Sequence, residues 1–94
     1  MLFDWDEAKA ISNEQKHQVT FQEAISVFID PLSELFDDAA HSEEEDRLVL
    51  IGHSDLGRLL LVSFTERPYV TRIISARQVT LRERKGYETQ LSGL

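Results

Sequence analysis

The spacing of apolar residues changes at Pro31, and this change constrains the fold more than any other feature of the chain. Before Pro31, apolar residues recur every three or four positions, which indicates helices. After it, they gather in short β-rich runs over residues 48–51, 59–64 and 70–75. Because helices come first and strands follow in succession, the pattern predicts the α+β class with an antiparallel sheet.

Two helices are expected before Pro31. Asp4 or Asp6 can cap the first, which runs to about Lys16. Thr20 and Glu23 have the spacing of a capping box. They open a second helix, and the Asp-Pro pair after it ends that helix because the residue before proline is disfavoured in the α region.

A small antiparallel meander of three to four strands is expected next. A short strand over residues 32–36 leads into a polar loop over residues 37–46. The connections over residues 54–57 and 66–68 have hairpin length, so the strands they join should pair with each other.

A final helix closes the expected fold. Thr80 and Glu83 form a second capping box, and the helix runs to about Gln90. Neither a repeat nor a linker interrupts the chain, so we expect residues 1–94 to form a single domain.

Composition excludes several classes of protein. The chain has no cysteine, which excludes disulfides, thiolate zinc sites and cysteine nucleophiles. Its apolar runs are far shorter than the ~18–20 residues of a membrane-spanning helix, and its acidic start does not resemble a signal peptide. We therefore expect a cytoplasmic protein without a membrane partner.

The charges are distributed unevenly. The net charge of −7 argues at first against nucleic-acid binding. However, residues 1–46 hold 13 acidic and 2 basic side chains, whereas residues 47–94 hold 4 acidic and 8 basic ones, so the halves carry −11 and +4. Either the halves neutralise each other in the fold, or they present separate acidic and basic surfaces.

Lys16 and His17 stand at the end of the first expected helix, where the helix dipole favours positive charge. A histidine beside a lysine can serve as a base, an acid or a phosphate contact near neutral pH. The alternative is an ordinary helix end with two solvated side chains.

Arg72 and Arg77 belong to the last expected strand and its exit. Alternation along a strand places Arg72 and Ile74 on one face of the sheet. A guanidinium in that position needs an anion or an acidic partner, because it stays charged. Phosphate binding and salt bridges to Glu83 or Glu66 are the two alternatives.

The last helix adds three cations, Arg82, Arg84 and Lys85, and the aromatic Tyr87. With the preceding arginines they make the last quarter of the chain basic, and an aromatic ring there is suited to stacking on a base. We therefore predict an RNA-binding role for these four residues, with a solvated helix face as the alternative.

An acidic run that begins at His41 suggests a metal site. A histidine and carboxylates can ligate magnesium or manganese. Adjacent acids, however, point in too many directions for one coordination sphere, so we interpret residues 41–46 as a solvated loop and expect no metal. The glycines fit neither a phosphate loop nor a dinucleotide fingerprint, so we expect no cofactor.

Short motifs from Phe3 to about Tyr87 carry a resemblance to a known family. In chain order, these motifs are Phe3-Asp4-Trp5-Asp6-Glu7-Ala8-Lys9, Asn13, Lys16-His17, Phe21-Gln22-Glu23-Ala24, His41-Ser42-Glu43-Glu44-Glu45-Asp46-Arg47, Ile51-Gly52, Gly57-Arg58-Leu59-Leu60, Thr65-Glu66-Arg67, Arg72-Ile73-Ile74-Ser75-Ala76-Arg77 and Glu83-Arg84 with Tyr87. The series resembles the BrnT toxin family. One position departs from the family pattern, since Gln18 stands where the family commonly has glycine, the residue that adopts left-handed turns most freely.

The resemblance implies a RelE-like fold and the toxin of a bacterial type II toxin–antitoxin system, an endoribonuclease that inhibits translation. It also implies a BrnA-type ribbon-helix-helix antitoxin as partner, with DNA contacted only through that antitoxin. By motif matching, functional roles fall on Lys16, His17, Arg72 and Arg77.

The expected reaction is metal-independent RNA cleavage. His17 would transfer protons with electrostatic support from Lys16, while Arg72 and Arg77 would stabilise negative charge. The alternative is a catalytically weak antitoxin-binding module or corepressor on the same fold, which the acidic first half and Gln18 suggest.

Overall fold

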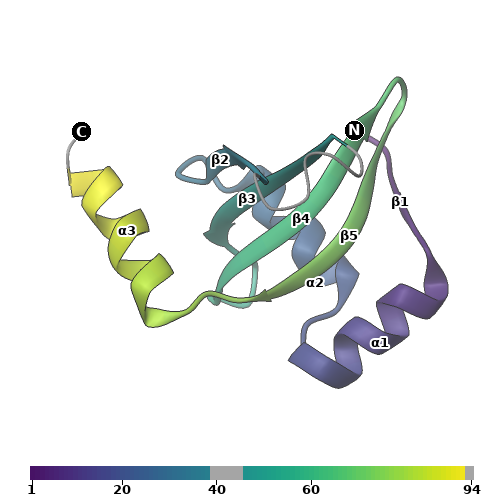
Figure 1. Cartoon of the computed structure of the whole chain (residues 1–94), viewed down its shortest axis with the longest axis horizontal. Coiled ribbons are helices and arrows are strands. Elements are labelled where there is room, and N and C mark those ends of the chain that lie inside the picture. The colour runs from purple at the N-terminus through teal and green to yellow at the C-terminus, as the bar shows by residue number, and fades with distance from the viewer. Residues whose placement is uncertain (39–45, 93–94) are drawn as a thin grey trace.

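The computed structural model describes residues 1–38 and 46–92. Most of the expected acidic loop, His41 included, falls within residues 39–45 and lies outside the described residues. In chain order the elements are β1 (Phe3–Trp5), α1 (Glu7–His17), α2 (Phe21–Ser26), the 3₁₀ helix η1 (Val27–Ile29), β2 (Glu34–Asp37), β3 (Arg47–His53), β4 (Leu59–Arg67), β5 (Val70–Gln78) and α3 (Leu81–Ser92) (Figure 1).

The five strands form one sheet in the order β1-β5-β4-β3-β2. Strands β2 to β5 each pair in antiparallel fashion with their neighbours along the chain. Hairpin-length connections join β3 to β4 and β4 to β5, as their turn residues predict. The α+β class and the antiparallel meander are thus confirmed.

Strand β1 is an element that the sequence pattern does not predict. It pairs in parallel with β5, with Asp4 opposite Arg72. A cap at Asp4 would place Trp5 on the first helix, but Trp5 lies in β1 and its ring packs edge-on against Phe21, with centroids 5.9 Å apart. A strand of three residues is too short to show an alternating period, and the helix itself begins later, at Glu7.

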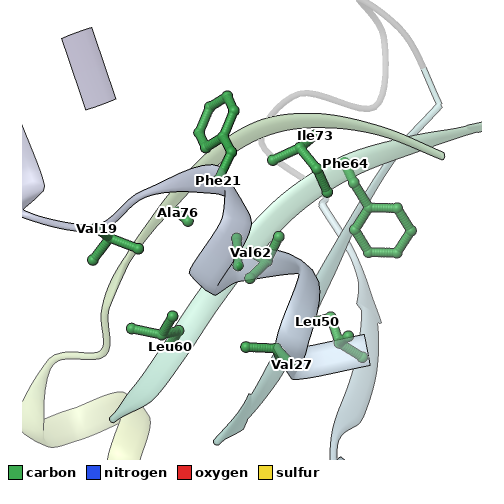
Figure 2. Close-up of a cluster of buried hydrophobic side chains, with 10 residues drawn as sticks. Val19, Phe21, Val27, Leu50, Leu60, Val62, Phe64, Ile73 and Ala76 are labelled. Atoms are coloured by element: carbon green, nitrogen blue, oxygen red, sulfur yellow. The ribbon is translucent and has the colours of Figure 1, made fainter. Parts of the chain in front are cut away.

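Segment 19–27 covers one face of the sheet, which we call the inner face, and the opposite side is the outer face. The buried cluster on the inner face comprises Val19, Phe21, Ala24, Val27, Leu50, Leu60, Val62, Phe64, Ile73 and Ala76 (Figure 2). Fully burying a large apolar side chain contributes about 1.5–3 kcal/mol. The larger buried cluster thus makes the inner face the main source of stability.

Both predicted capping boxes open helices. Thr20 Oγ1 accepts a hydrogen bond from the Glu23 N–H at 3.0 Å. At α3 the box is reciprocal, since Thr80 Oγ1 accepts from the Glu83 N–H at 3.1 Å and the Glu83 carboxylate accepts from the Thr80 N–H at 2.8 Å. At α2 the Glu23 carboxylate instead accepts a hydrogen bond from Arg58.

Helix α3 leaves the end of β5 and projects away from the sheet (Figure 1). Tyr87 and Leu91 attach it to the outer face, where they pack with Ile51 and Leu59. Within residues 1–38 and 46–92, the helices are too short or too polar to cross a membrane.

Candidate functional site

A cavity of about 190 Å³ lies between α1 and the middle of β5. Its lining comprises Lys9, Ser12, Asn13, Lys16, His17, Ile74 and Ser75. The cavity therefore brings Lys16 and His17, from α1, against the strand that carries Arg72 and Arg77.

A left-handed turn follows His17. Gln18 has φ 57° and ψ 35°, and its N–H donates to the Glu14 carbonyl oxygen at 2.9 Å. Its side-chain Nε2 donates to the Gln15 carbonyl oxygen at 3.0 Å. A left-handed residue other than glycine costs about 1–2 kcal/mol, and these hydrogen bonds offset part of that cost. Gln18 therefore adopts the conformation that the family's glycine would favour.

A partly buried ion pair, Arg58 with Glu23, supports this turn. Arg58 Nη2 donates to the Gln18 carbonyl oxygen at 2.9 Å, and Arg58 Nε donates to Glu23 Oε2 at 2.9 Å. The Glu23 side chain is only 4% exposed, and it also accepts from the Ser54 hydroxyl at 2.7 Å. The Arg58 hydrogen bond lowers the pKa of the Glu23 carboxyl, against the opposing effect of burial. The pair thus stays charged and fixes the backbone that presents His17.

Asn13 joins α1 to β5 beneath the same cavity. Its Nδ2 donates to the carbonyl oxygens of Val19 at 2.9 Å and Ala76 at 2.8 Å, and its Oδ1 accepts from the Ala76 N–H at 3.0 Å. These bonds occupy the edge of β5 just beyond the end of its pairing with β1. Sequence reasoning assigned Asn13 no role, and only its place in a family motif set it apart from an ordinary polar helix residue.

Replacing Asn13 with alanine is expected to lower the free energy of unfolding by about 2–4 kcal/mol, because buried backbone groups of Val19 and Ala76 lose their partners. Urea denaturation measures this change. Ser12→Ala is the matched control, since it removes a polar group from the same cavity wall at a position that is exposed. An Asn13→Ala midpoint equal to that of Ser12→Ala would contradict the role given to these bonds.

A β-bulge interrupts β5 beside the cavity. Ser63 of β4 pairs with Ser75, whereas the next residue, Phe64, pairs with Ile73. Ile74 is therefore the extra residue. Bulges redirect side chains, and this one lies at the cavity wall.

The bulge places both strand arginines on the outer face. Ile73 and Ala76 are both buried on the inner face, so alternation from each of them directs Arg72, Ser75 and Arg77 to the outer face. Without the extra residue, Arg72 and Arg77 would lie on opposite faces because they are five positions apart. The sequence pattern does not reveal this arrangement.

Arg72 has an exposed acidic partner that was not among those predicted. Its Nη1 lies 3.3 Å from Asp4 Oδ2, with the two side chains 34% and 48% exposed. Asp6, and not Asp4, caps α1, by accepting from the Lys9 N–H. An exposed pair of this kind is worth at most about 1 kcal/mol. A phosphate group can therefore displace Asp4 at small cost.

Arg77 forms the salt bridge to Glu83 that the sequence offered as one alternative. Its Nη1 and Nη2 donate to the two carboxylate oxygens of Glu83 at 2.8 and 2.9 Å. This hydrogen bonding lowers the pKa of the Glu83 carboxyl to about 2. Arg77 is thus more firmly held than Arg72.

The Arg77–Glu83 pair is expected to stabilise the fold by about 1 kcal/mol above pH ~4.5. Because folding depresses the pKa of Glu83 to about 2, this contribution is lost as the pH falls from ~4.5 towards 2. Glu83→Gln keeps a residue suited to the capping box but removes the charge. The difference in Tm between the parent and Glu83→Gln should be largest near pH 6–7, and the two Tm values should be nearly equal near pH 2. Glu14→Gln is the exposed control, and a Tm difference independent of pH would contradict the pairing.

The three cations of α3 lie on its surface, whereas its tyrosine does not. Arg82 and Lys85 are exposed and Arg84 is partly exposed. Tyr87 is 3% exposed, and its hydroxyl donates to the Leu32 carbonyl oxygen at 3.0 Å. Burial raises the pKa of this hydroxyl. The ring is part of the core in this conformation, so it is not placed for stacking on a base.

Within the part of the chain that the structure describes, His, Asp and Glu side chains do not gather in threes that could hold a metal ion. The acidic run considered above for a metal falls largely within residues 39–45, outside that part.

The site can be compared with known proteins. A family model described as the ribonuclease toxin BrnT of type II toxin–antitoxin systems matches residues 5–83. The crystal structure of the Brucella abortus ribonuclease toxin BrnT is similar, with a TM-score of 0.68 and 25% sequence identity over 85% of this chain and 97% of that chain. The comparison with curated proteins finds no match. The matched span includes both the cavity and the strand that carries the two arginines.

Proposed function

The chain belongs to the BrnT family of ribonuclease toxins of type II toxin–antitoxin systems, and from this premise we propose that it is an endoribonuclease that acts at the cavity between α1 and β5. The observation that supports this proposal is that Lys16 and His17 of α1 line a cavity whose other wall is Ile74 and Ser75 of β5. Arg72 and Arg77 do not line the cavity, but they precede and follow these two residues along β5.

The proposed reaction is attack of a ribose 2′-oxygen on the adjacent phosphorus. The P–O2′ bond forms and the P–O5′ bond breaks, which leaves a 2′,3′-cyclic phosphate and a 5′-hydroxyl. One proton leaves the 2′-hydroxyl and one reaches the departing 5′-oxygen, while negative charge increases on the phosphate oxygens. The protein must therefore position the strand, move protons and stabilise charge.

His17 is the proposed proton-transfer group, because an imidazole exchanges protons near neutral pH and this one lines the cavity. Lys16, on the same helical turn, adds positive charge to the same wall. Arg72 stabilises the phosphate oxygens, since its exposed partner Asp4 is easily displaced. These groups supply proton transfer and charge stabilisation by themselves, which supports a metal-independent mechanism.

Other cations are proposed to hold the RNA strand. Arg77 lies on the outer face with Arg72 and, although paired with Glu83, contributes positive charge there. Arg82, Arg84 and Lys85 extend this charge onto α3, where they can follow the sugar–phosphate backbone. We leave Tyr87 out of this group because its ring is buried.

Cleavage of RNA would inhibit translation in the cytoplasm. A BrnA-type ribbon-helix-helix antitoxin is the proposed partner, and any contact with operon DNA would pass through it. Controlled expression of this chain in bacteria tests the proposal. Growth and amino-acid incorporation should stop, and co-expression of the antitoxin encoded beside the gene should restore them.

The alternative function, an antitoxin-binding module with little catalysis, makes a different prediction. It is favoured by the engagement of Arg77 with Glu83 and by the burial of Tyr87, which remove two groups from RNA contact. Unchanged growth together with a stable antitoxin complex on pull-down would support this module and overturn the ribonuclease.

A further inference from the structure

Strand β2 forms the border of the sheet opposite β1 and has β3 as its neighbour in the sheet order (Figure 1). The Asp38 N–H donates to the Arg47 carbonyl oxygen of β3 at 3.1 Å. Backbone groups alternate in direction along a strand, so the N–H and C=O groups of Leu35 and Asp37 point away from β3. The outer edge of β2 therefore presents two donors and two acceptors to an approaching strand.

Apolar side chains surround this edge. Leu35 is 59% exposed and Phe36 is 38% exposed. Leu35 pairs with Leu50 on the inner face, whereas Phe36 pairs with Val49 and so lies on the outer face. A strand added beside β2 would thus contact an apolar side chain above and another below the sheet. Natural proteins usually cover an exposed apolar edge strand, because such an edge pairs readily with another chain.

The charged side chains of β2 itself have one sign. They are Glu34 and Asp37, both acids. Elsewhere two acids of the first half are paired with arginines of the second, through Asp4–Arg72 and Glu23–Arg58. Glu34 and Asp37 thus place negative charge on the strand at the open border of the sheet, away from the cavity.

This negative charge favours one kind of binding partner for the open edge over the others. A second copy of the chain would bring like carboxylates together across the new pairing, and RNA or DNA would be repelled. A strand with alternating apolar and basic side chains would satisfy the backbone groups, cover Leu35 and Phe36, and pair with the acids.

We propose that the outer edge of β2 binds a β-strand of the antitoxin in which apolar residues alternate with lysine or arginine. The inference rests on the proposed function only in taking the partner to be the antitoxin of a ribonuclease toxin. Strands β3 and β4 separate β2 from β5, a distance of about 14 Å at the usual strand spacing. The added strand therefore anchors the antitoxin, and a further segment of it must reach the cavity to block cleavage.

Synthetic peptides of about 15 residues that tile the antitoxin encoded beside this gene provide the test. They are titrated into the full chain, with NMR chemical shifts and amide exchange as readouts. The peptide that binds should have the alternating basic pattern, slow exchange of the Leu35 and Asp37 amides by about tenfold or more, and leave the rate of RNA cleavage unchanged. Protection confined to β1 or α3, or no protection by any peptide, would overturn the proposal.

Two matched variants complete the test. Asp37→Lys should weaken binding of that peptide by about tenfold or more, whereas Glu14→Lys, the same change of charge on exposed α1, should not. Equal affinities of the two variants would overturn the proposal. If Leu35 and Asp37 are protected but the parent does not cleave RNA, the docking edge stands and the ribonuclease fails. If the parent cleaves RNA but Leu35 and Asp37 are not protected, the ribonuclease stands and the docking edge fails.

Discussion

Replacing His17 with alanine is expected to slow RNA cleavage by about 10²–10⁴-fold, the usual contribution of a positioned proton-transfer group. The imidazole lies at the end of α1 and lines the cavity with Ser75 of β5. The change removes the proposed proton-transfer group, but leaves Lys16 and Arg72 to bind phosphate. We therefore expect a loss in kcat larger than any change in KM.

A matched histidine variant makes this result specific. His53→Ala is the matched control, because it removes the same residue type from β3 at a side chain that is 48% exposed. Equal rates for His17→Ala and His53→Ala would contradict the role of His17.

Replacing Arg72 with alanine is expected to slow cleavage by about 10²–10³-fold, the usual cost of removing an electrostatic stabiliser. Its guanidinium pairs with the exposed Asp4 side chain, so the free energy of unfolding of the variant should lie within about 1 kcal/mol of the parent's. Arg72→Lys should recover only part of the rate, because a lysine keeps the charge but not the two-pronged contact with phosphate.

Two controls show whether Arg72 stabilises the transition state directly or acts only through the overall charge of the protein. Arg67→Ala removes the same charge at the exposed end of β4 and should slow cleavage by less than about threefold at moderate salt. Asp4→Ala frees Arg72 and should leave cleavage at least as fast as in the parent. If Arg67→Ala and Arg72→Ala are slowed alike, Arg72 acts only through the overall charge.

The elements that the sequence predicts best are those with short-range signals. Thr80 and Glu83 mark the start of α3 through a reciprocal pair of hydrogen bonds three residues apart. The antiparallel strands follow from β-rich runs and hairpin-length turns. Strand β1 escapes prediction because its position depends on pairing with β5, 68 positions away at Asp4 and Arg72, and not on a local pattern.

In the candidate site, too, sequence reasoning found the residues with local signals and missed those that depend on distant contacts. Local reasoning identified Lys16 and His17 at a helix end and offered Glu83 as a partner for Arg77. It did not identify Asn13 or the Arg58–Glu23 pair, because their hydrogen bonds join positions 63 and 35 apart along the chain. Nor does periodicity reveal the bulge at Ile74, which changes the face of Arg77 by adding one residue.

The alternative that the two halves of the chain neutralise each other is correct in part. Asp4 and Glu23, both from the acidic half, meet Arg72 and Arg58. These contacts bind the first half of the chain to the sheet and support the turn that holds His17. The two acids of β2, Glu34 and Asp37, lie at the far border of the sheet, away from the proposed RNA path.

The central claim is that this chain cleaves RNA through its ribose 2′-hydroxyl at the α1–β5 cavity. Its most direct test incubates the purified chain, in excess EDTA, with an RNA and with the same RNA carrying one 2′-deoxy nucleotide at the cleaved position. We expect cleavage of the RNA to a 2′,3′-cyclic phosphate and a 5′-hydroxyl, and an intact deoxy-substituted strand. Cleavage of both strands at that position, or of neither, would contradict it.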